Sequence, residues 1–249
     1  MKAWVYRIGW TAPFLLLLAA QPAFAQSLTL DMGGDGGSST GHIVQLLMLL
    51  TVLSLAPAIL ITVTSFTRIV VVLSFLRNAL GTQSTPPNIV MVSLALFLTG
   101  FVMAPTLQTS YDNGIAPLIA DKITEQQAFD RTAAPIHDFM MNHVRTEDLD
   151  LFAGMAKVDT KATDAKDIPL RVVVPAFMIS ELRRAFEIGF LLFLPFLIID
   201  IVVASILMSM GMMMLPPVTI SLPFKLIFFV LVDGWYLVAG SLVQSFGGS

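Results

Sequence analysis

The chain has 249 residues, of which 56% are hydrophobic and only 12% charged, and its mean hydropathy is +0.82. Soluble domains usually carry about 25% charged residues, so the composition argues against a water-soluble domain and for an integral membrane protein. The net charge of −3 provides no basic excess for nucleic-acid phosphates. The absence of cysteine excludes disulfides, thiolate metal sites and cysteine nucleophiles.

The first 42 residues contain a targeting segment and a linker. Lys2 and Arg7 precede a leucine-rich run that ends in Ala23-Phe24-Ala25, which is the pattern of a secretory signal peptide cleaved after Ala25. An uncleaved first helix is the alternative. Residues 26–42 then form a linker that is rich in glycine and serine. Cleavage would place the mature N-terminus outside the cytoplasm.

Four apolar stretches follow, long enough for helices rather than strands: Ile43–Leu76, Asn88–Ala104, Ile188–Leu215 and Val218–Phe246. They predict two helical hairpins, residues 43–104 and 188–249. At 1.5 Å per residue the first stretch would be about 51 Å long and the second about 25 Å, against a hydrocarbon core of about 30 Å. Because prolines and charges interrupt them, we expect kinked or broken helices buried against other protein.

Between the hairpins, residues 105–187 hold 22 of the 31 Lys, Arg, Asp and Glu residues. With the N-terminus outside, this segment is predicted to be periplasmic, and Arg68 and Arg77 then lie towards the cytoplasm, as the positive-inside tendency favours. The segment is expected to be mostly helical over 121–150, to form an exposed loop over 157–167, and to begin another helix at Pro175.

The sequence motifs give no support to an enzymatic function. The histidines are His42, His137 and His143, and the last two do not share a helix face. Neither an H-E-x-x-H zinc motif nor a G-x-S-x-G nucleophile motif occurs. We therefore expect no enzymatic activity, no metal and no cofactor, with the histidines as surface or hydrogen-bonded packing residues.

Asp200 and Lys225 are single charges inside apolar stretches, and such residues usually pair or line a wet cavity. With the hairpin tip placed at Pro216, the two side chains are not expected to meet within one chain, so pairing between subunits is predicted. A structural ion pair is preferred to a charge relay. On a later helix, Glu181 with Arg184 and Arg183 with Glu187 have the spacings of local ion pairs.

Five of the 14 methionines lie within residues 208–214, beside Gly211 and Pro216. Methionine is flexible and polarizable, so it fills irregular gaps and adapts to varied partners. Three in succession, Met212, Met213 and Met214, cannot all face one side of a helix. Composition alone favours ordinary packing over an opening.

Three segments carry a resemblance to a known family. Residues 175–190 (PAFMISELRRAFEIGF), 197–214 (from LIIDIVVAS to GMMM) and 222–235 (from LPFK to VDGW) are similar to signatures of the FliP family. The resemblance covers roughly residues 43–249 and includes the signal peptide. It implies an all-α membrane protein of helical hairpins with broken helices, assembled into an oligomeric pore.

The resemblance further implies a function in flagellar type III protein export. It implies about five copies, in a closed pore with FliQ and FliR, completed by FlhB and FlhA. The family's methionine gasket falls on Met212, Met213 and Met214, its buried charges on Asp200 and Lys225, and its subunit contact on Glu181. Unfolded flagellar axial proteins would be the substrates, and the bacterial inner membrane within the flagellar basal body the location.

Two alternatives stay open. The virulence-type III secretion counterpart shares the fold and the gasket, although the cleavable signal and the long periplasmic segment favour the flagellar form. An ion channel or secondary transporter is suggested by the charges in apolar stretches. A transporter predicts inverted repeats, and the two hairpins show no evident similarity to each other.

Overall fold

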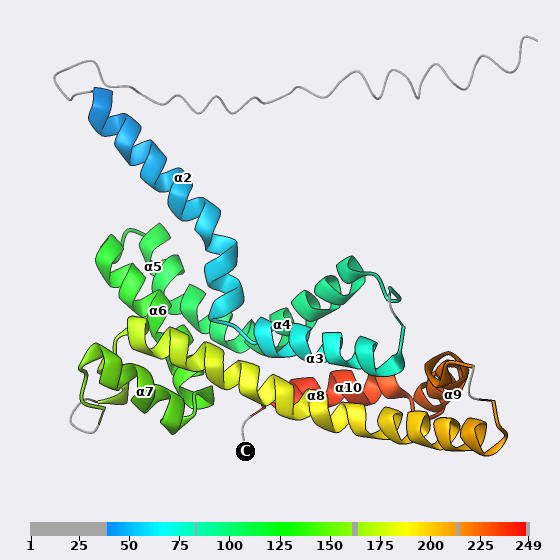
Figure 1. Ribbon diagram of the computed structural model, residues 1–249. Coiled ribbons are helices and arrows are strands. Elements are labelled where there is room, and N and C mark those ends of the chain that lie inside the picture. The colour runs from blue at the N-terminus through cyan, green and yellow to red at the C-terminus, as the bar shows by residue number, and fades with distance from the viewer. Residues whose placement is uncertain (1–38, 83, 161–163, 213–214, 248–249) are drawn as a thin grey trace, which may run out of the picture. The chain divides into compact units, whose positions relative to one another are not determined.

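The computed structural model describes residues 39–82, 84–160, 164–212 and 215–247. Within these ranges the regular elements are all helical: α2 (Ser39–Thr62), α3 (Phe66–Leu80), α4 (Asn88–Ser110), the π-helix η1 (Tyr111–Ile115), α5 (Ala116–Ile119), α6 (Glu125–His143), α7 (Thr146–Ala156), the 3-10 turn η2 (Ala165–Asp167), α8 (Leu170–Ser209), α9 (Pro217–Leu231) and α10 (Gly234–Gln244) (Figure 1). The predicted all-α class is confirmed.

The chain divides into two units, residues 1–52 and 53–249, and the packing described below belongs to the second. The predicted signal peptide, residues 1–25, lies outside the described residues and stays a prediction. Most of the predicted linker also lies outside them, although α2 begins at Ser39 and so takes in the linker's last residues. 

Two of the four apolar stretches are broken, as expected. The first stretch is interrupted between Thr62 and Phe66, where α2 ends and α3 begins. The last is interrupted at Asp233, a non-glycine residue with φ of 50°, and α9 and α10 meet there at a bend of 64°. Two uninterrupted helical runs, Asn88–Ile119 and Leu170–Ser209, are long and apolar enough to cross a membrane, and up to four spans result if each bent pair is one span.

Helix α8 is the longest element, and its 40 residues extend about 60 Å, twice the thickness of a hydrocarbon core. It starts at Leu170, five residues before the predicted start, and contains Pro175 and Pro195. It also runs without a break through the predicted boundary between residues 187 and 188. A change in side-chain polarity does not interrupt backbone hydrogen bonding, so the start of the predicted second hairpin lies inside a continuous helix.

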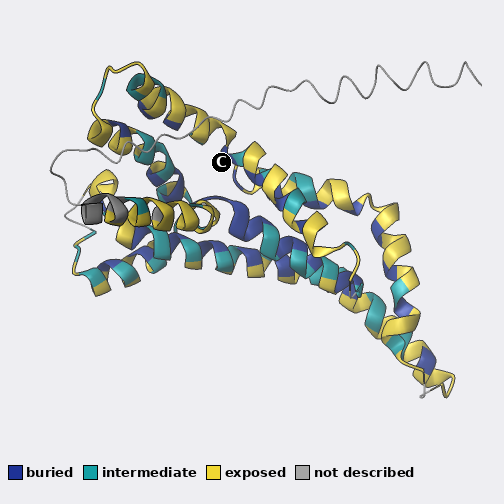
Figure 2. Ribbon diagram, turned by 90° about the horizontal axis from the view of Figure 1, so that it is seen from above, coloured by how far each residue is buried: buried dark blue, intermediate teal, exposed yellow. Residues whose placement is uncertain are grey.

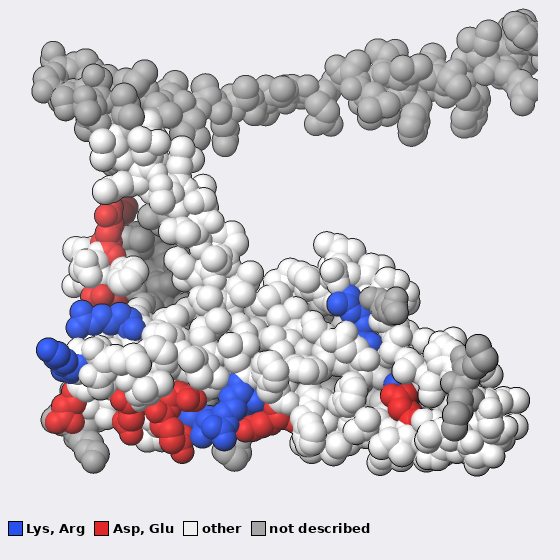
Figure 3. All heavy atoms as spheres, in the orientation of Figure 1, with Lys and Arg blue, Asp and Glu red and all other residues white. Residues whose placement is uncertain are grey.

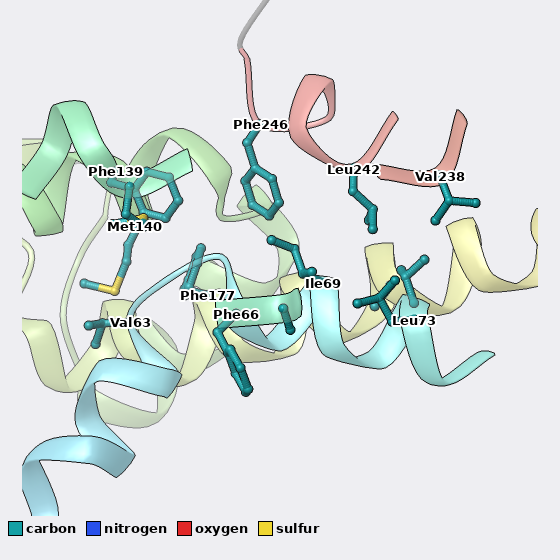
Figure 4. Packing of buried hydrophobic residues seen from close by; sticks show 14 of the residues in the cluster. Val63, Phe66, Ile69, Leu73, Phe139, Met140, Phe177, Val238, Leu242 and Phe246 are labelled. Atoms are coloured by element: carbon teal, nitrogen blue, oxygen red, sulfur yellow. The ribbon is translucent and has the colours of Figure 1, made fainter. Parts of the chain in front are cut away.

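The core is centred on α3 and α8. Ile69, Val72, Leu73 and Leu76 recur along α3 with the three- and four-residue spacing of one helix face, and all are fully buried. Val238 and Leu242 of α10 point towards Ile69 and Leu73 from the other side (Figure 4). Helix α3 therefore lies between α8 and α10, which both come from much later in the chain.

Polar and apolar surfaces are separated along the molecule. In Figure 3 the acidic and basic side chains gather over α6, α7 and the first half of α8, whereas the second half of α8 and α9 are almost free of them. The same region of α8 and α9 is largely exposed (Figure 2), with large apolar side chains such as Ile198, Phe224 and Leu231 at its surface. An exposed apolar surface of this extent requires lipid or protein to cover it.

The π-helix η1 and the end of α4 pack closely against α6. Ser110 donates a hydrogen bond to the Thr132 carbonyl (3.0 Å), and a Cβ added at Gly114 would lie 2.9 Å from both the Ala128 carbonyl oxygen and the Thr132 nitrogen. Backbone atoms cannot move aside as a flexible side chain can. The contact between η1 and α6 therefore depends on glycine at position 114.

Substituting Gly114 with Ala is expected to destabilise the fold by about 1–3 kcal/mol, as overpacking generally does. Thermal unfolding of the purified protein in detergent would measure this as a lowered Tm. Gly100→Ala is the matched control, because it is also helical but has no atom within 4 Å of the added Cβ. The control is expected to be neutral or stabilising, and an equal loss in both variants would contradict the prediction.

Candidate functional site: a methionine-rich tip and two buried ion pairs

The hairpin of α8 and α9 ends in a tightly hydrogen-bonded turn. Gly211 has φ of 73°, its N–H donates to the Met208 carbonyl (3.1 Å), and the Met212 N–H donates to the Leu207 carbonyl (3.0 Å). These two hydrogen bonds form a Schellman motif, for which glycine is the favoured residue because it has no Cβ to clash at positive φ. Pro217, a residue well suited to the first helical position, then starts α9.

The turn presents methionine side chains at the surface. Met208, Met210 and Met212 are all exposed. Met213 and Met214, the other two residues predicted for the gasket, lie outside the described residues, so the gasket itself stays a prediction. Main-chain hydrogen bonds hold the backbone at Met212 in place, and they do not depend on the Met212 side chain.

Behind the tip, Lys225 of α9 and Asp200 of α8 form an ion pair. The Lys225 Nζ donates to the Asp200 Oδ2 (2.6 Å) and to the Ala79 carbonyl (3.1 Å), and the Ser221 hydroxyl donates to the Asp200 Oδ1 (2.5 Å). Lys225 is 3% exposed and Asp200 25%. Since the last carbonyls of a helix lack intrahelical donors, Lys225 also caps the end of α3. The cluster ties α3, α8 and α9 together.

The prediction that Asp200 and Lys225 would not meet within one chain is wrong. It placed the tip at Pro216, but the connection between the helices runs from Met210 to Pro216. Asp200 precedes the last α8 residue by nine positions and Lys225 follows the first α9 residue by eight, so the two lie at nearly the same height in the hairpin. The preferred interpretation, a structural ion pair, agrees with this geometry, and no subunit contact is needed to form it.

A second ion pair lies deeper, between Arg68 of α3 and Glu181 of α8. Arg68 donates from Nε to the Glu181 Oε2 (2.8 Å) and from Nη2 to the Oε1 (2.5 Å). Its Nη1 donates to both the carbonyl and the hydroxyl oxygen of Ser245 (3.0 Å each), and its Cζ lies 3.7 Å from the centre of the Phe246 ring. The side chains are 1% and 0% exposed. This bidentate, fully partnered geometry is what a buried ion pair requires.

These contacts change the interpretation of three charged residues. Glu181 does not pair with Arg184, whereas the expected pair of Arg183 with Glu187 is present at 3.1 Å on the surface. Arg68 is enclosed in the core, so it is not evidence for a cytoplasmic side. A fully buried carboxylate cannot touch another copy directly, and a subunit-contact role for Glu181 stays a prediction that would have to act through its neighbours.

Sequence reasoning missed Arg68 as the partner of Glu181. The available signal was an arginine inside an apolar stretch with no acid near it in sequence, which is the same signal that singled out Asp200 and Lys225. The role of Ser245 and Phe246 had no such signal, because neither residue type is unusual at the end of an apolar helix.

The histidines that the structure describes are packing residues, as expected. His137 Nε2 is hydrogen-bonded to the Ile168 carbonyl (2.9 Å), and His143 Nδ1 to the Phe139 carbonyl (2.7 Å). His143 also contacts the rings of Phe139 and Phe246. Both residues therefore have clear partners within the fold, and the side chain of His42 is not described.

Comparison with known proteins shows the family to which the chain belongs. The model of the FliP family matches residues 49–242. The chain is 62% identical over 224 residues to the flagellar biosynthetic protein FliP of Caulobacter vibrioides, covering 90% of this chain and 84% of that protein. It is 61% identical to the FliP of Bacillus subtilis over 203 residues (82% and 91%) and 49% identical to that of Aquifex aeolicus over 233 residues (93% and 97%). With a match over most of its length to the family and to these relatives, the chain belongs to the FliP family.

Proposed function

We propose that this chain acts in flagellar biosynthesis as a component of the type III protein export gate. Several copies, about five as the family resemblance implies, assemble with FliQ and FliR into a closed ring, and FlhB and FlhA complete the gate. The complex lies in the bacterial inner membrane within the flagellar basal body, and residues 105–187 face the periplasm. Unfolded flagellar axial proteins are the substrates.

The observation that carries this proposal is the α8–α9 hairpin, with exposed methionines at its tip and an ion pair behind it. Such a hairpin holds its tip at a fixed height while the tip side chains stay adaptable. Several copies arranged around an axis would place a ring of thioethers in the central channel. A ring of this kind is apolar enough to exclude water, and its flexible side chains can adapt to a passing polypeptide.

The exposed apolar surfaces of α8 and α9 need lipid or neighbouring subunits to cover them, as a membrane-embedded assembly would provide. The relatives quoted above carry flagellar names, which favours the flagellar form over the virulence counterpart. Within the chain Asp200 and Lys225 neutralise each other, which supports a structural role and gives no support to an ion channel or transporter.

Replacing Met212, Met213 and Met214 together with Ala is expected to make cells leak small ions while protein export continues. Shorter side chains leave a wider, wettable opening, and we expect ion leak to rise by about tenfold or more. Membrane-potential dyes would report the leak, and secreted hook and filament protein would report export. Met155→Ala on α7 is the control, because Met155 is also exposed but lies far from the tip in sequence. An intact permeability barrier in the triple variant would refute the gasket.

A further inference from the structure

Few charged residues lie in the two apolar hairpins, and the structure pairs most of them. Residues 43–104 and 188–249 contain five charges: Arg68, Arg77, Asp200, Lys225 and Asp233. Arg68 is neutralised by Glu181, and Asp200 and Lys225 neutralise each other. One base and one acid, Arg77 and Asp233, remain without an ion pair in the part of the chain that the structure describes.

Arg77 lies in the last turn of α3, and its hydrogen-bond acceptors are neutral. Its Nη1 donates to the Asn88 side-chain oxygen and to the Pro86 carbonyl (3.5 Å), and its buried Nε has no hydrogen-bond partner among the described residues. Neutral oxygens do not balance a full charge. Ile89, next to Asn88, is 72% exposed, so the surface beside this hydrogen bond is apolar.

Asp233 lies exposed at the bend between α9 and α10. Its φ of 50° is in the left-handed region that favours glycine, and its side chain makes no capping hydrogen bond with α10. Its neighbours Leu231 and Tyr236 are 79% and 74% exposed. A lone carboxylate in an apolar membrane surface is costly unless an opposite charge meets it.

The two unpaired charges lie towards the same end of α3. Helices α3 and α10 run in opposite directions, as the order of their labelled side chains in Figure 4 shows. The start of α10, next to Asp233, therefore lies towards the end of α3, which carries Arg77. Helix α9 also reaches this end, since Lys225 donates to the Ala79 carbonyl (3.1 Å). Rotation about an axis along α3 would keep both charges at one level in neighbouring copies.

We propose that Arg77 of one copy of this chain pairs with Asp233 of the next copy in the assembly. The inference rests on the proposed function, which supplies the several copies. Each copy would present its arginine to one neighbour and its aspartate to the other, which is a head-to-tail contact. Such a contact closes into a ring in which every arginine has one aspartate, whatever the number of copies.

A second copy satisfies these surfaces better than lipid does. Hydrocarbon chains would cover Ile89, Leu231 and Tyr236 but would leave both charges without a counter-ion, which is costly at membrane depth. A neighbouring copy covers the apolar side chains and neutralises the charges together. Once those side chains exclude water, the attraction between the charges strengthens, and it fixes which surfaces meet.

Thiol cross-linking tests the contact directly, because the chain contains no cysteine. Copies with Arg77→Cys and differently tagged copies with Asp233→Cys would be expressed together with the partner subunits. The purified complex would be treated with a short bis-maleimide, which spans more than a disulfide bond can. We expect cross-linked dimers only when both variants are present. Chains that carry both cysteines should give a ladder that extends beyond the dimer.

A control and a charge exchange complete the test. Met155→Cys in place of Arg77→Cys should give no dimer, although Met155 is 70% exposed, because it lies on α7. Arg77→Glu and Asp233→Lys should each lower the yield of assembled complex by about tenfold or more, because like charges would then face each other. Together they should restore most of that yield. Lysine suits the backbone of Asp233, since Lys157 has φ of 56° in this chain.

Four results would overturn the inference: cross-linking within one chain and none between mixed copies, a ladder that stops at the dimer, cross-links to a different subunit only, or cross-linking without rescue by the charge exchange. If the complex still contains several copies in any of these cases, the proposed function stands while the pairing falls. A purified chain that is only monomeric would instead remove the multi-copy pore itself.

Discussion

Replacing Glu181 with Gln is expected to destabilise the fold by about 3–5 kcal/mol, because it leaves the Arg68 guanidinium charged, buried and without its counter-ion. Arg68 would keep the Ser245 oxygens, which are neutral acceptors and cannot balance a full charge. Thermal unfolding in detergent should show a large drop in Tm, and less protein should enter the assembled complex. Glu187→Gln is the matched control, since its pair with Arg183 is exposed and should contribute under 1 kcal/mol.

A double substitution distinguishes an unpaired charge from lost packing. Replacing Arg68 and Glu181 together with Met removes both charges and keeps most of the side-chain volume. We expect the double variant to be more stable than the Glu181→Gln single variant, because buried ion pairs can often be exchanged for apolar residues at little cost. If the double variant were the less stable of the two, the buried charge would not be the cause.

Reversing the charge of Asp200 with Asp200→Lys is expected to destabilise the hairpin by about 2–3 kcal/mol, because two ammonium groups would then face each other. The expected loss of stability is smaller than for Glu181→Gln, since Asp200 is 25% exposed and water screens part of the repulsion. The yield of assembled complex and its thermal stability would measure the loss.

Reversal at both positions, Asp200→Lys with Lys225→Asp, should restore about half of that loss, as a coupled pair does in a double-mutant cycle. Full restoration is not expected, because Lys225 also donates to the Ala79 carbonyl and an aspartate there would repel that oxygen. Asp200→Asn tests the remaining contact, since its amide oxygen can still accept from Ser221. No rescue by the double reversal would show that the pair contributes little to assembly.

Much of the fold could be read from the sequence because it depends on local signals. Long apolar stretches predicted the helices, and the prolines and charges within them predicted that some helices would be broken. The positions of the breaks were not predicted, since Pro57, Pro195 and Pro223 lie inside helices. The ends of the helices were harder to predict from the sequence. Pro175 looked like a start and lies inside α8, five residues after its first residue. The boundary drawn from charge between residues 187 and 188 lies inside α8, since charge follows the environment of a helix and not its backbone.

The candidate site was predictable in its members but not in its pairings. Asp200 and Lys225 stood out because isolated charges in apolar stretches need a partner. Which partner they take depends on where the hairpin turns, and a shift of a few residues in that turn decided whether they met. The Arg68–Glu181 contact joins residues 113 positions apart. This long-range contact is set by the packing of α3 on α8, which no local sequence pattern encodes.

The contact between Arg68 and Ser245 spans 177 positions, which has a consequence for biosynthesis. Arg68 is translated long before Ser245 and Phe246. Its guanidinium therefore lacks these contacts while most of the polypeptide is still being synthesised. Newly made protein should therefore become protease-resistant only after the final helical turn has emerged. Nascent chains stalled before that point should remain open and be favoured targets for quality-control proteases.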